Sequence, residues 1–207
     1  MNIARVLYPV EVLGPGKRLG IWTCGCDRHC FGCSNPELWE MQQRYVISVS
    51  DFEKMLRQFL RDHRIDGITL TGGDPFYQAE ELETLLTVLR GFSDDILVYT
   101  GYTYEELKAT TRPAVAACLS NISVLVDGPY IEELNDGALM RGSSNQRIIY
   151  LKPAIESKYR AYLDNLGSNK IQNFTSEDGI ISVGIHQADF QKRIADETRK
   201  RGIVIDG

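Results

Sequence analysis

Four of the five cysteines in the chain lie within ten residues, in the stretch CGCDRHCFGC. Cys26, Cys30 and Cys33 have the spacing C-x3-C-x2-C, and Cys24 precedes them as C-x-C. Thiols clustered in this way form disulfides, bind zinc, act as a redox pair or hold an iron–sulfur cluster. The spacing favours an iron–sulfur cluster, but by itself it leaves zinc and a redox role open.

Two observations weigh against structural zinc. Such sites usually pair one short cysteine spacing with a second pair further along the chain, and here only Cys118 remains. Three closely spaced thiolates can also hold three irons of a cubane and leave the fourth iron open. An open position on a metal centre is typical of catalysis rather than of a structural role.

The bulk composition sets the context for these thiols. The chain has 207 residues, enough for one hydrophobic core, and is 43% hydrophobic and 25% charged. Its net charge of −5 gives no basic excess for nucleic acid or anionic membranes. There is no apolar run of the roughly 18 residues that span a membrane, and no signal-peptide pattern. We therefore expect a protein of the reducing cytoplasm, where metal ligands are commoner than disulfides.

Predicted strands and helices alternate through the first 150 residues. Apolar runs predict strands at 18–23, 65–70, 96–99 and 122–126, and the last three begin one βα unit apart. Between them, Ser50 with Glu53 predicts a capped helix, Ala79–Arg90 has helical apolar spacing, and Thr103 with Glu106 forms a second capping box. The sequence predicts an α/β fold with a parallel sheet that curls into part of a (β/α) barrel.

The pattern changes after Tyr150. A helix is expected at 154–166, a hairpin of strands 170–174 and 179–184, a helix at 187–201 and a short strand at 203–205. No linker rich in Pro, Gly or Ser separates this part. We expect one domain over 1–207, with a core at 1–150 and a small hairpin-helix appendage at 151–207.

A second motif follows the predicted strand at 65–70. Thr71-Gly72-Gly73-Asp74-Pro75 places two glycines and a carboxylate at a strand end, where backbone can approach a ligand and an acid can accept from an ammonium group. Alone, this motif is weak and is better explained as a tight βα turn. It becomes specific in combination with the cysteine motif, which lies about 40 residues upstream.

Taken together, these motifs resemble the radical S-adenosylmethionine (SAM) superfamily and, more narrowly, the activating proteins of anaerobic, class III ribonucleotide reductases. The resemblance covers most of the first 150 residues and rests on several short motifs in the same order. They are YPV (8–10), GPG with Arg18, GCDRHCFGCSNPELW (25–39), LTGGDP (70–75), YTGY (99–102), VLVDGPY (124–130) and RGSSNQR (141–147).

The resemblance implies roles for individual residues. The ligands of a [4Fe–4S] cluster would be Cys26, Cys30 and Cys33. The segment that holds the methionine amino group of SAM would be Gly72, Gly73 and Asp74. Thr100 and Asp127, at the carboxyl ends of later strands, are candidates for SAM contacts, although Asp127 also suits a simple Asp-Gly turn. The polar run 143–146 could cap a helix, line the site or contact SAM or the target. No catalytic side chain is assigned.

The implied activity is reductive cleavage of SAM. A one-electron donor such as a flavodoxin reduces the cluster, SAM breaks to methionine and a 5′-deoxyadenosyl radical, and this radical takes a hydrogen atom from a glycine of a partner enzyme. A radical SAM enzyme acting on a small molecule or peptide, and a non-catalytic zinc or iron–sulfur module, are the alternatives. The aromatic candidates for a docking face, with core packing as the alternative, are Trp39, Phe76, Tyr77 and Tyr102.

Some features depart from the resemblance or fall outside it. Cys24 stands where a small residue is expected, and we predict that it is not a ligand because a fourth thiolate would block SAM. Cys118 is expected in the core. His29 is expected to bond backbone or donate to a cluster sulfur, whereas His63 and His186 are expected at the surface or at helix ends. The 55 or so residues beyond the last motif leave the identity of the partner open.

Overall fold

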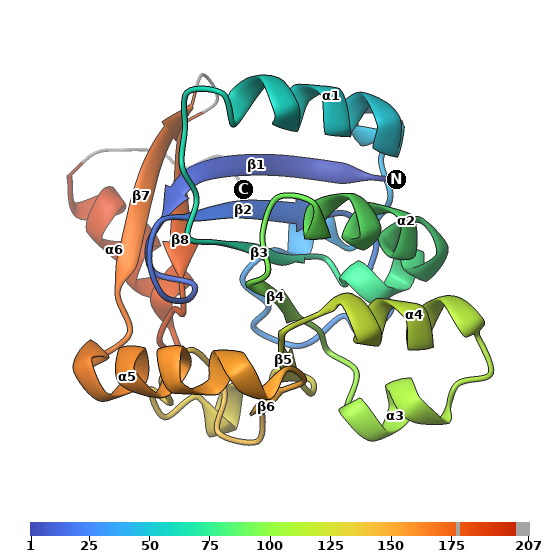
Figure 1. Ribbon diagram of the computed structural model, residues 1–207. Coiled ribbons are helices and arrows are strands. Elements are labelled where there is room, and N and C mark those ends of the chain that lie inside the picture. The colour runs from blue at the N-terminus through green and yellow to red at the C-terminus, as the bar shows by residue number, and fades with distance from the viewer. Residues whose placement is uncertain (177–178, 202–207) are drawn as a thin grey trace.

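The computed structural model describes residues 1–176 and 179–201, so the strand expected at 203–205 lies outside the described residues. Six strands form one mixed sheet in the order β1-β2-β3-β4-β5-β6 (Figure 1). The strands β2 to β5 run parallel, and the edge strands β1 and β6 are antiparallel to their neighbours. The bounds are β1 (Ile3–Val10), β2 (Arg18–Thr23), β3 (Gly67–Gly72), β4 (Ile96–Tyr99), β5 (Val124–Asp127) and β6 (Arg147–Tyr150).

Helices cover the sheet, and a separate antiparallel hairpin follows it in the chain. The helices are α1 (Val49–Phe59), α2 (Ala79–Arg90), α3 (Tyr104–Ala109), α4 (Pro113–Asn121), α5 (Glu156–Leu166) and α6 (Phe190–Lys200). The hairpin strands are β7 (Ile171–Ser176) and β8 (Gly179–Gly184). The α/β class and the C-terminal hairpin followed by a helix agree with the prediction from sequence.

The two faces of the sheet have different covers, because side chains alternate along each strand. On one face, alternate residues such as Ile21, Leu70 and Val98 pack against α1, α2 and α4 in the largest apolar core. On the other face, Val124 and its neighbours pack against α5, while Trp22 packs against the hairpin (Figure 1). The parallel strands are therefore buried on both sides, which explains their continuous apolar sequence.

Local helix signals were mostly, but not entirely, interpreted correctly. Thr103 and Glu106 form the expected capping box at the start of α3. The N-cap of α1, however, is Ser48 rather than Ser50, and the Ser48 hydroxyl accepts from the amide of Asp51. Both serines precede an acidic residue by three positions, so the sequence pattern could not distinguish them.

A buried ion-pair network joins the sheet to α5. The guanidinium of Arg18 is fully buried and donates to both carboxylate oxygens of Asp95, each at 3.0 Å, and to the Thr69 hydroxyl at 2.7 Å. Lys158 and Tyr159 of α5 donate to the same carboxylate at 2.6 and 2.7 Å. Removing one member would strand a buried charge, so this network holds α5 in place.

The C-terminal extension, defined here as residues 151–201, continues from this anchor into the hairpin. Gln172 of β7 donates to the carbonyl of Pro9 at 2.7 Å and accepts from the amide of Glu11 at 3.0 Å. Val183 of β8 is buried beside Trp22. The hairpin thus closes over the end of β1 and part of β2. In the described part of the chain, no helix is long and apolar enough to cross a membrane.

Candidate active site

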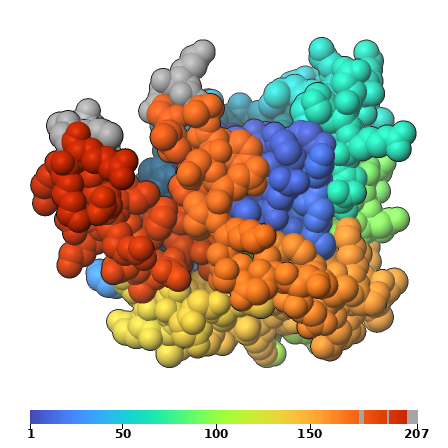
Figure 2. All heavy atoms as spheres, turned by 90° about the vertical axis from the view of Figure 1, so that its left-hand side faces the viewer, coloured from blue at the N-terminus to red at the C-terminus, as the bar shows by residue number. Residues whose placement is uncertain are grey.

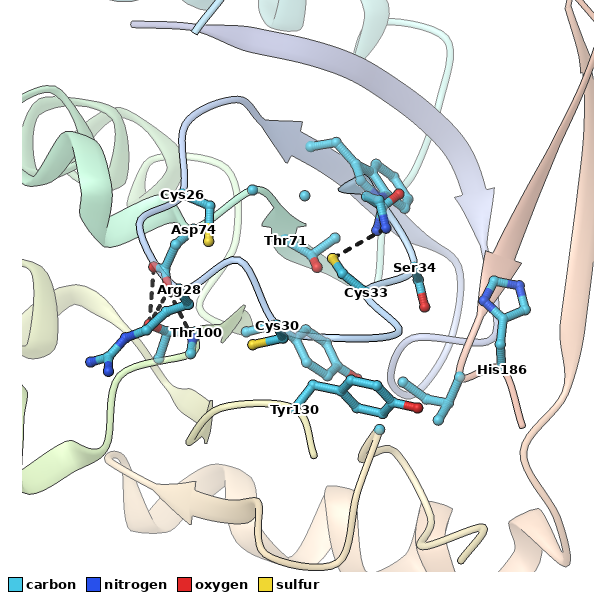
Figure 3. Close-up of a pocket in the computed structure, with 18 of the residues that line it drawn as sticks. Cys26, Arg28, Cys30, Cys33, Ser34, Thr71, Asp74, Thr100, Tyr130 and His186 are labelled. Atoms are coloured by element: carbon cyan, nitrogen blue, oxygen red, sulfur yellow. Dashed lines mark hydrogen bonds between the residues drawn. The ribbon is translucent and has the colours of Figure 1, made fainter. Parts of the chain in front are cut away.

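A pocket opens where β2, β3, β4 and β5 end, the edge at which parallel α/β sheets bind ligands. The three thiols of the C-x3-C-x2-C motif, the Gly72-Gly73-Asp74 segment and Thr100 all line it. In Figure 3, Asp74 lies beside Cys26, and Thr100 is hydrogen-bonded to Asp74. Motifs that lie 26 to 74 residues apart in the sequence therefore line one pocket.

The cysteine loop, residues 24–39, leaves β2 and is tied down at both ends. The amide of Gly25 donates to the carbonyl of Leu38 at 2.9 Å, and the amide of Cys26 donates to the carbonyl of Trp39 at 2.8 Å. These two bonds close the loop on itself. The two ends of the loop are therefore held together, and this restricts where its thiols can lie.

Side chains that follow β4 hold the middle of the cysteine loop. The hydroxyl of Tyr102 donates to the carboxylate of Asp27 at 2.7 Å. The guanidinium of Arg28 lies 4.1 Å from the ring centroid of Tyr102 and pairs with Glu106 of α3 at 2.9 Å. Tyr102 thus anchors the loop and is used inside the molecule, whereas the sequence had made it a candidate for the docking face.

The surroundings of the thiols suit thiolate ligands. All five cysteines are free of disulfides. Burial raises the pKa of the Cys26 and Cys33 thiols, and backbone amides partly offset the effect. One of these, the amide of Asn35, donates to the Cys33 sulfur at 3.4 Å. Amides that point at sulfur stabilise the deprotonated, metal-bound form and help to set a cluster's reduction potential.

The donor set of the pocket suits an iron–sulfur cluster. Cys26, Cys30 and Cys33 are free of disulfides and line one cavity. An iron–sulfur cubane places each thiolate on a different iron, so three thiols around one cavity are a fitting donor set. That these three cysteines are the ligands stays a prediction.

The remaining two cysteines lie elsewhere. Cys24 is fully buried in the small apolar core that also contains Trp22, Leu38 and Val183, and it does not line the pocket. Cys118 is fully buried in α4, with its sulfur 3.4 Å from the carbonyl of Ala79, as expected for a core residue. The position of Cys24 is consistent with the prediction that it is not a ligand.

The two glycines Gly72 and Gly73 line the pocket, and the packing of the cysteine loop also requires them. A Cβ on Gly73 would lie 2.5 Å from the carbonyl oxygen of Gly25 and 2.8 Å from that of Leu38. Gly72 has φ +111°, and a Cβ there would lie 2.5 Å from the carbonyl oxygen of Thr23. Only glycine allows the cysteine loop to pack this closely against the end of β3.

Asp74 is held more tightly than its sequence motif suggests. Its carboxylate is 1% exposed and accepts from the amides of Phe76 at 3.0 Å and Gly101 at 2.7 Å, and from the Thr100 hydroxyl at 2.9 Å. Burial raises the pKa of this carboxyl to about 6, against the lowering effect of those donors. Asp74 therefore joins the ends of β3 and β4, and it leaves little acceptor capacity for a ligand.

Asp127 lies apart from the pocket. Its carboxylate accepts from the amide of Tyr104 at 2.7 Å and pairs with the guanidinium of Arg147 on β6. It does not line the cavity that holds the thiols, so a SAM contact from Asp127 stays a prediction. The carboxylate links β5, β6 and the start of α3, a role that the Asp-Gly pattern alone could not reveal.

The polar run 143–146 folds back on the turn after β5. The Gln146 side chain accepts from the amide of Gly142 at 2.8 Å and donates to the carbonyl of Gly128 at 2.8 Å, and the Ser143 hydroxyl accepts from the amide of Ile131 at 3.1 Å. Gly142 and Gln146 line the pocket. The run therefore shapes one wall of the site.

The other aromatic and histidine candidates lie in different environments. Phe76 is 1% exposed and belongs to the core, so of its two alternatives core packing holds. Tyr77 is exposed, and Trp39 lines the pocket with the ring of His29 stacked on it at 4.7 Å between ring centroids. His63 bonds the carbonyl of Phe59 near the end of α1, as expected for an end-of-helix residue.

The sequence predicts His186 at the surface or at a helix end, and the structure adds a role in the pocket. It lies in the wall of the thiol pocket together with Ser182, Gly184 and their neighbours at the end of β8 (Figure 3). Its ring bonds the Ser182 hydroxyl at 3.1 Å, and its carbonyl accepts from Asn135 at 2.9 Å. No local signal marked these residues, because they reach the site only through the packing of the hairpin.

Comparisons with known proteins bear on this arrangement. Residues 12–149 match the family described as a 4Fe-4S single cluster domain. The chain is 37% identical over 153 residues to the anaerobic ribonucleoside-triphosphate reductase-activating protein of Salmonella typhi, which covers 70% of this chain and 96% of the relative. It belongs to this family. The Escherichia coli K12 relative is 35% identical over 70% of this chain and 96% of its own length, and the Haemophilus influenzae relative 39% over 68% and 93%.

Family membership identifies the activity and the cofactors, which the geometry of the pocket alone does not. This activating protein is an oxidoreductase that acts on a partner enzyme, and its cofactors are a [4Fe–4S] cluster and SAM, as the sequence motifs predicted. The relatives are matched over almost their whole length, while close to a third of this chain lies outside the match. The family match ends at residue 149, just before the C-terminal extension.

Proposed function

We propose that this protein generates a glycyl radical on an anaerobic ribonucleotide reductase. The observation that carries the proposal is the pocket itself, in which three free thiols, the Gly72–Asp74 segment and Thr100 face one cavity at the strand ends. The printed names of the relatives identify such a reductase as the enzyme that they activate.

Cys26, Cys30 and Cys33 would hold the cluster, and the loop contacts described above would keep their spacing fixed. When bound, the cluster supplies the electron that cleaves SAM to methionine and a 5′-deoxyadenosyl radical, which takes a hydrogen atom from a partner glycine. The protein's own contribution is to position the residues that would hold the cluster. It holds three thiolates on a closed loop, and the end of the hairpin forms one wall of the pocket.

Gly72, Gly73 and Asp74 would receive the methionine end of SAM. Because the Asp74 carboxylate already accepts three protein donors, its larger contribution is to fix the backbone of the two glycines. Thr100 would help from the end of β4, where its hydroxyl holds Asp74 and lines the same pocket. Asp127 would act at a distance, by holding Arg147 and the start of α3.

Four further features belong to the same proposal. The sheet would be part of a (β/α) barrel whose open end carries the chemistry. Residues 1–207 would act as one domain, with a core at 1–150 and the extension at 151–207. A flavodoxin would be a suitable one-electron donor, and the cytoplasm the compartment, since free thiols and a cluster need reducing conditions.

The test is anaerobic reconstitution with iron and sulfide, followed by reduction with dithionite in the presence of SAM and the anaerobic reductase of the same organism. We expect 5′-deoxyadenosine in solution and an electron paramagnetic resonance doublet on the reductase. Replacing dithionite by reduced flavodoxin tests the donor. If 5′-deoxyadenosine forms but no reductase radical appears, the target is another molecule, and a small-molecule or peptide substrate takes its place.

A further inference from the structure

A second cavity opens beside the thiol pocket. We call it the entry groove: the cysteine loop forms one wall, and β8 with the start of α6 forms the other. Figure 2 shows the orange hairpin and the red helix α6 on one face of the molecule. The groove and the pocket share five lining residues: Ser34, Asn35, Tyr130, Ser182 and His186. The two cavities therefore adjoin.

The walls of the entry groove carry unusual side chains. Phe31, between the second and third cysteines, is 81% exposed, and Ile180 of β8 is 73% exposed. Among the described residues these are the two most exposed large apolar side chains, and both line this groove. Exposed apolar groups scattered over a surface need no explanation, but a pair that faces one groove beside a reactive site is typical of a docking surface.

The residues shared by groove and pocket are all polar or carry a polar group, and two of them are serines. Ser34 follows the last cysteine, and Ser182 lies on the other wall, on β8. These two short side chains leave the least bulk in the way of an incoming main chain. Such a passage suits an extended peptide segment whose innermost residue is glycine, with apolar neighbours left outside against Phe31 and Ile180.

The hairpin wall of the groove is well anchored. Its far strand is tied to β1 through Gln172, its end is tied to the turn after β5 through Asn135 and the carbonyl of His186, and Val183 is buried against Trp22. This wall lies in the extension, beyond residue 149 where the family match ends. The groove is therefore a preformed feature that this chain adds to the shared core.

We propose that the C-terminal extension is a partner-docking element. The entry groove receives the glycine-bearing segment of the enzyme that this protein activates, and Phe31 and Ile180 grip the apolar residues on either side of the glycine. The proposal rests on the proposed function, because that chemistry requires a polypeptide glycine to reach the thiol pocket. It adds the path by which the glycine-bearing segment reaches the thiol pocket and the surface that binds this segment. One wall of that surface, β8 with the start of α6, lies outside the family match.

The experiment compares Ile180→Ser and Phe31→Ser with Met55→Ser, a control on α1 whose side chain is 57% exposed and lies outside the groove. Each reconstituted protein is assayed for iron content, for binding to the anaerobic reductase, for 5′-deoxyadenosine formed without the reductase, and for radical on the reductase. Loss of an apolar anchor from an interface costs roughly tenfold or more in affinity. We expect that loss for both groove variants, with a matching fall in radical yield at limiting protein.

Ile180 is distant in sequence from the cysteines, so Ile180→Ser should keep wild-type iron and wild-type 5′-deoxyadenosine formation. Equal reductase binding by Ile180→Ser, Phe31→Ser and Met55→Ser would overturn the docking proposal while leaving the activation chemistry intact. A fall in 5′-deoxyadenosine without the reductase, at normal iron content in Ile180→Ser, would also overturn it, since the groove would then serve SAM. If the wild type itself places no radical on the reductase, the proposed function fails instead.

Discussion

The strand ends of the core and the C-terminal extension meet at one pocket but are built differently. At the strand ends, buried carboxylates each accept several donors from neighbouring elements, as Asp74 and Asp127 do. Beyond α5, which the buried network around Asp95 holds, the hairpin is attached by the amide side chains of Gln172 and Asn135 and by the buried Val183. A dense polar network fixes the strand ends, whereas fewer contacts attach the hairpin wall. We therefore expect changes in the hairpin to leave the thiols in place.

The largest effect that would test this division is loss of the cluster. Cys26→Ala, Cys30→Ala and Cys33→Ala each remove one ligand, and we expect almost complete loss of iron and of absorbance near 400 nm after reconstitution. Cys24→Ala is the matched control, because its thiol is buried in a separate apolar core. If Cys24→Ala loses as much iron as Cys26→Ala, then Cys24 is a ligand, and the prediction of three ligand cysteines is wrong.

Gly73→Ala should produce the next largest effect. A methyl group there would lie 2.5 Å from the Gly25 carbonyl oxygen, so the cysteine loop must shift, at a cost of roughly 1–3 kcal/mol. We expect at least half of the reconstituted iron to be lost and a lower thermal midpoint. Gly91→Ala is the control, since a Cβ there meets nothing closer than 3.2 Å. Similar iron contents for the two variants would show that close approach at Gly73 is unimportant.

A third prediction concerns pH and the polar network. Burial raises the pKa of Asp74 to about 6, so its carboxylate is mostly ionised at pH 7.5 and roughly one-tenth ionised at pH 5. Because the ionised carboxylate accepts the donors that fix the glycine pair, SAM affinity should fall by up to about tenfold as the pH drops between these values. Asp74→Asn should bind more weakly at pH 7.5 and lose this pH dependence. Isothermal titration with SAM measures both, and an equal slope in the two proteins would contradict the assignment.

The smallest expected effect lies in the extension. Gln172→Ala removes two hydrogen bonds to β1, worth about 1 kcal/mol in total after the exchange with water. We expect hydrogen exchange in β7 and β8 to accelerate by about fivefold, while iron content stays at the wild-type level. Asn165→Ala is a control, because that side chain bonds only within α5. If Gln172→Ala also loses iron, the wall is not separable from the thiol site.

Residue types at short spacing determined much of this protein. The C-x3-C-x2-C motif, the Gly-Gly-Asp turn and the strand–helix rhythm were readable from the sequence, because ligand spacing, turn geometry and amphipathic periods are local properties. The same local patterns placed the hairpin and the final helix. They missed the edge strands β1 and β6, whose mixed burial gives no clean period, and they selected Ser50 where Ser48 caps α1.

Only the tertiary structure decided which side chains face the pocket. Asp127 follows a strand end as a ligand-binding acid would, yet Arg147 and the amide of Tyr104 occupy it. His186 and Ser182 carried no motif, yet they line the site because the hairpin folds back more than 150 residues in sequence to pack beside Trp22. Contacts of that range depend on how apolar faces fit together in three dimensions, and no local pattern encodes them.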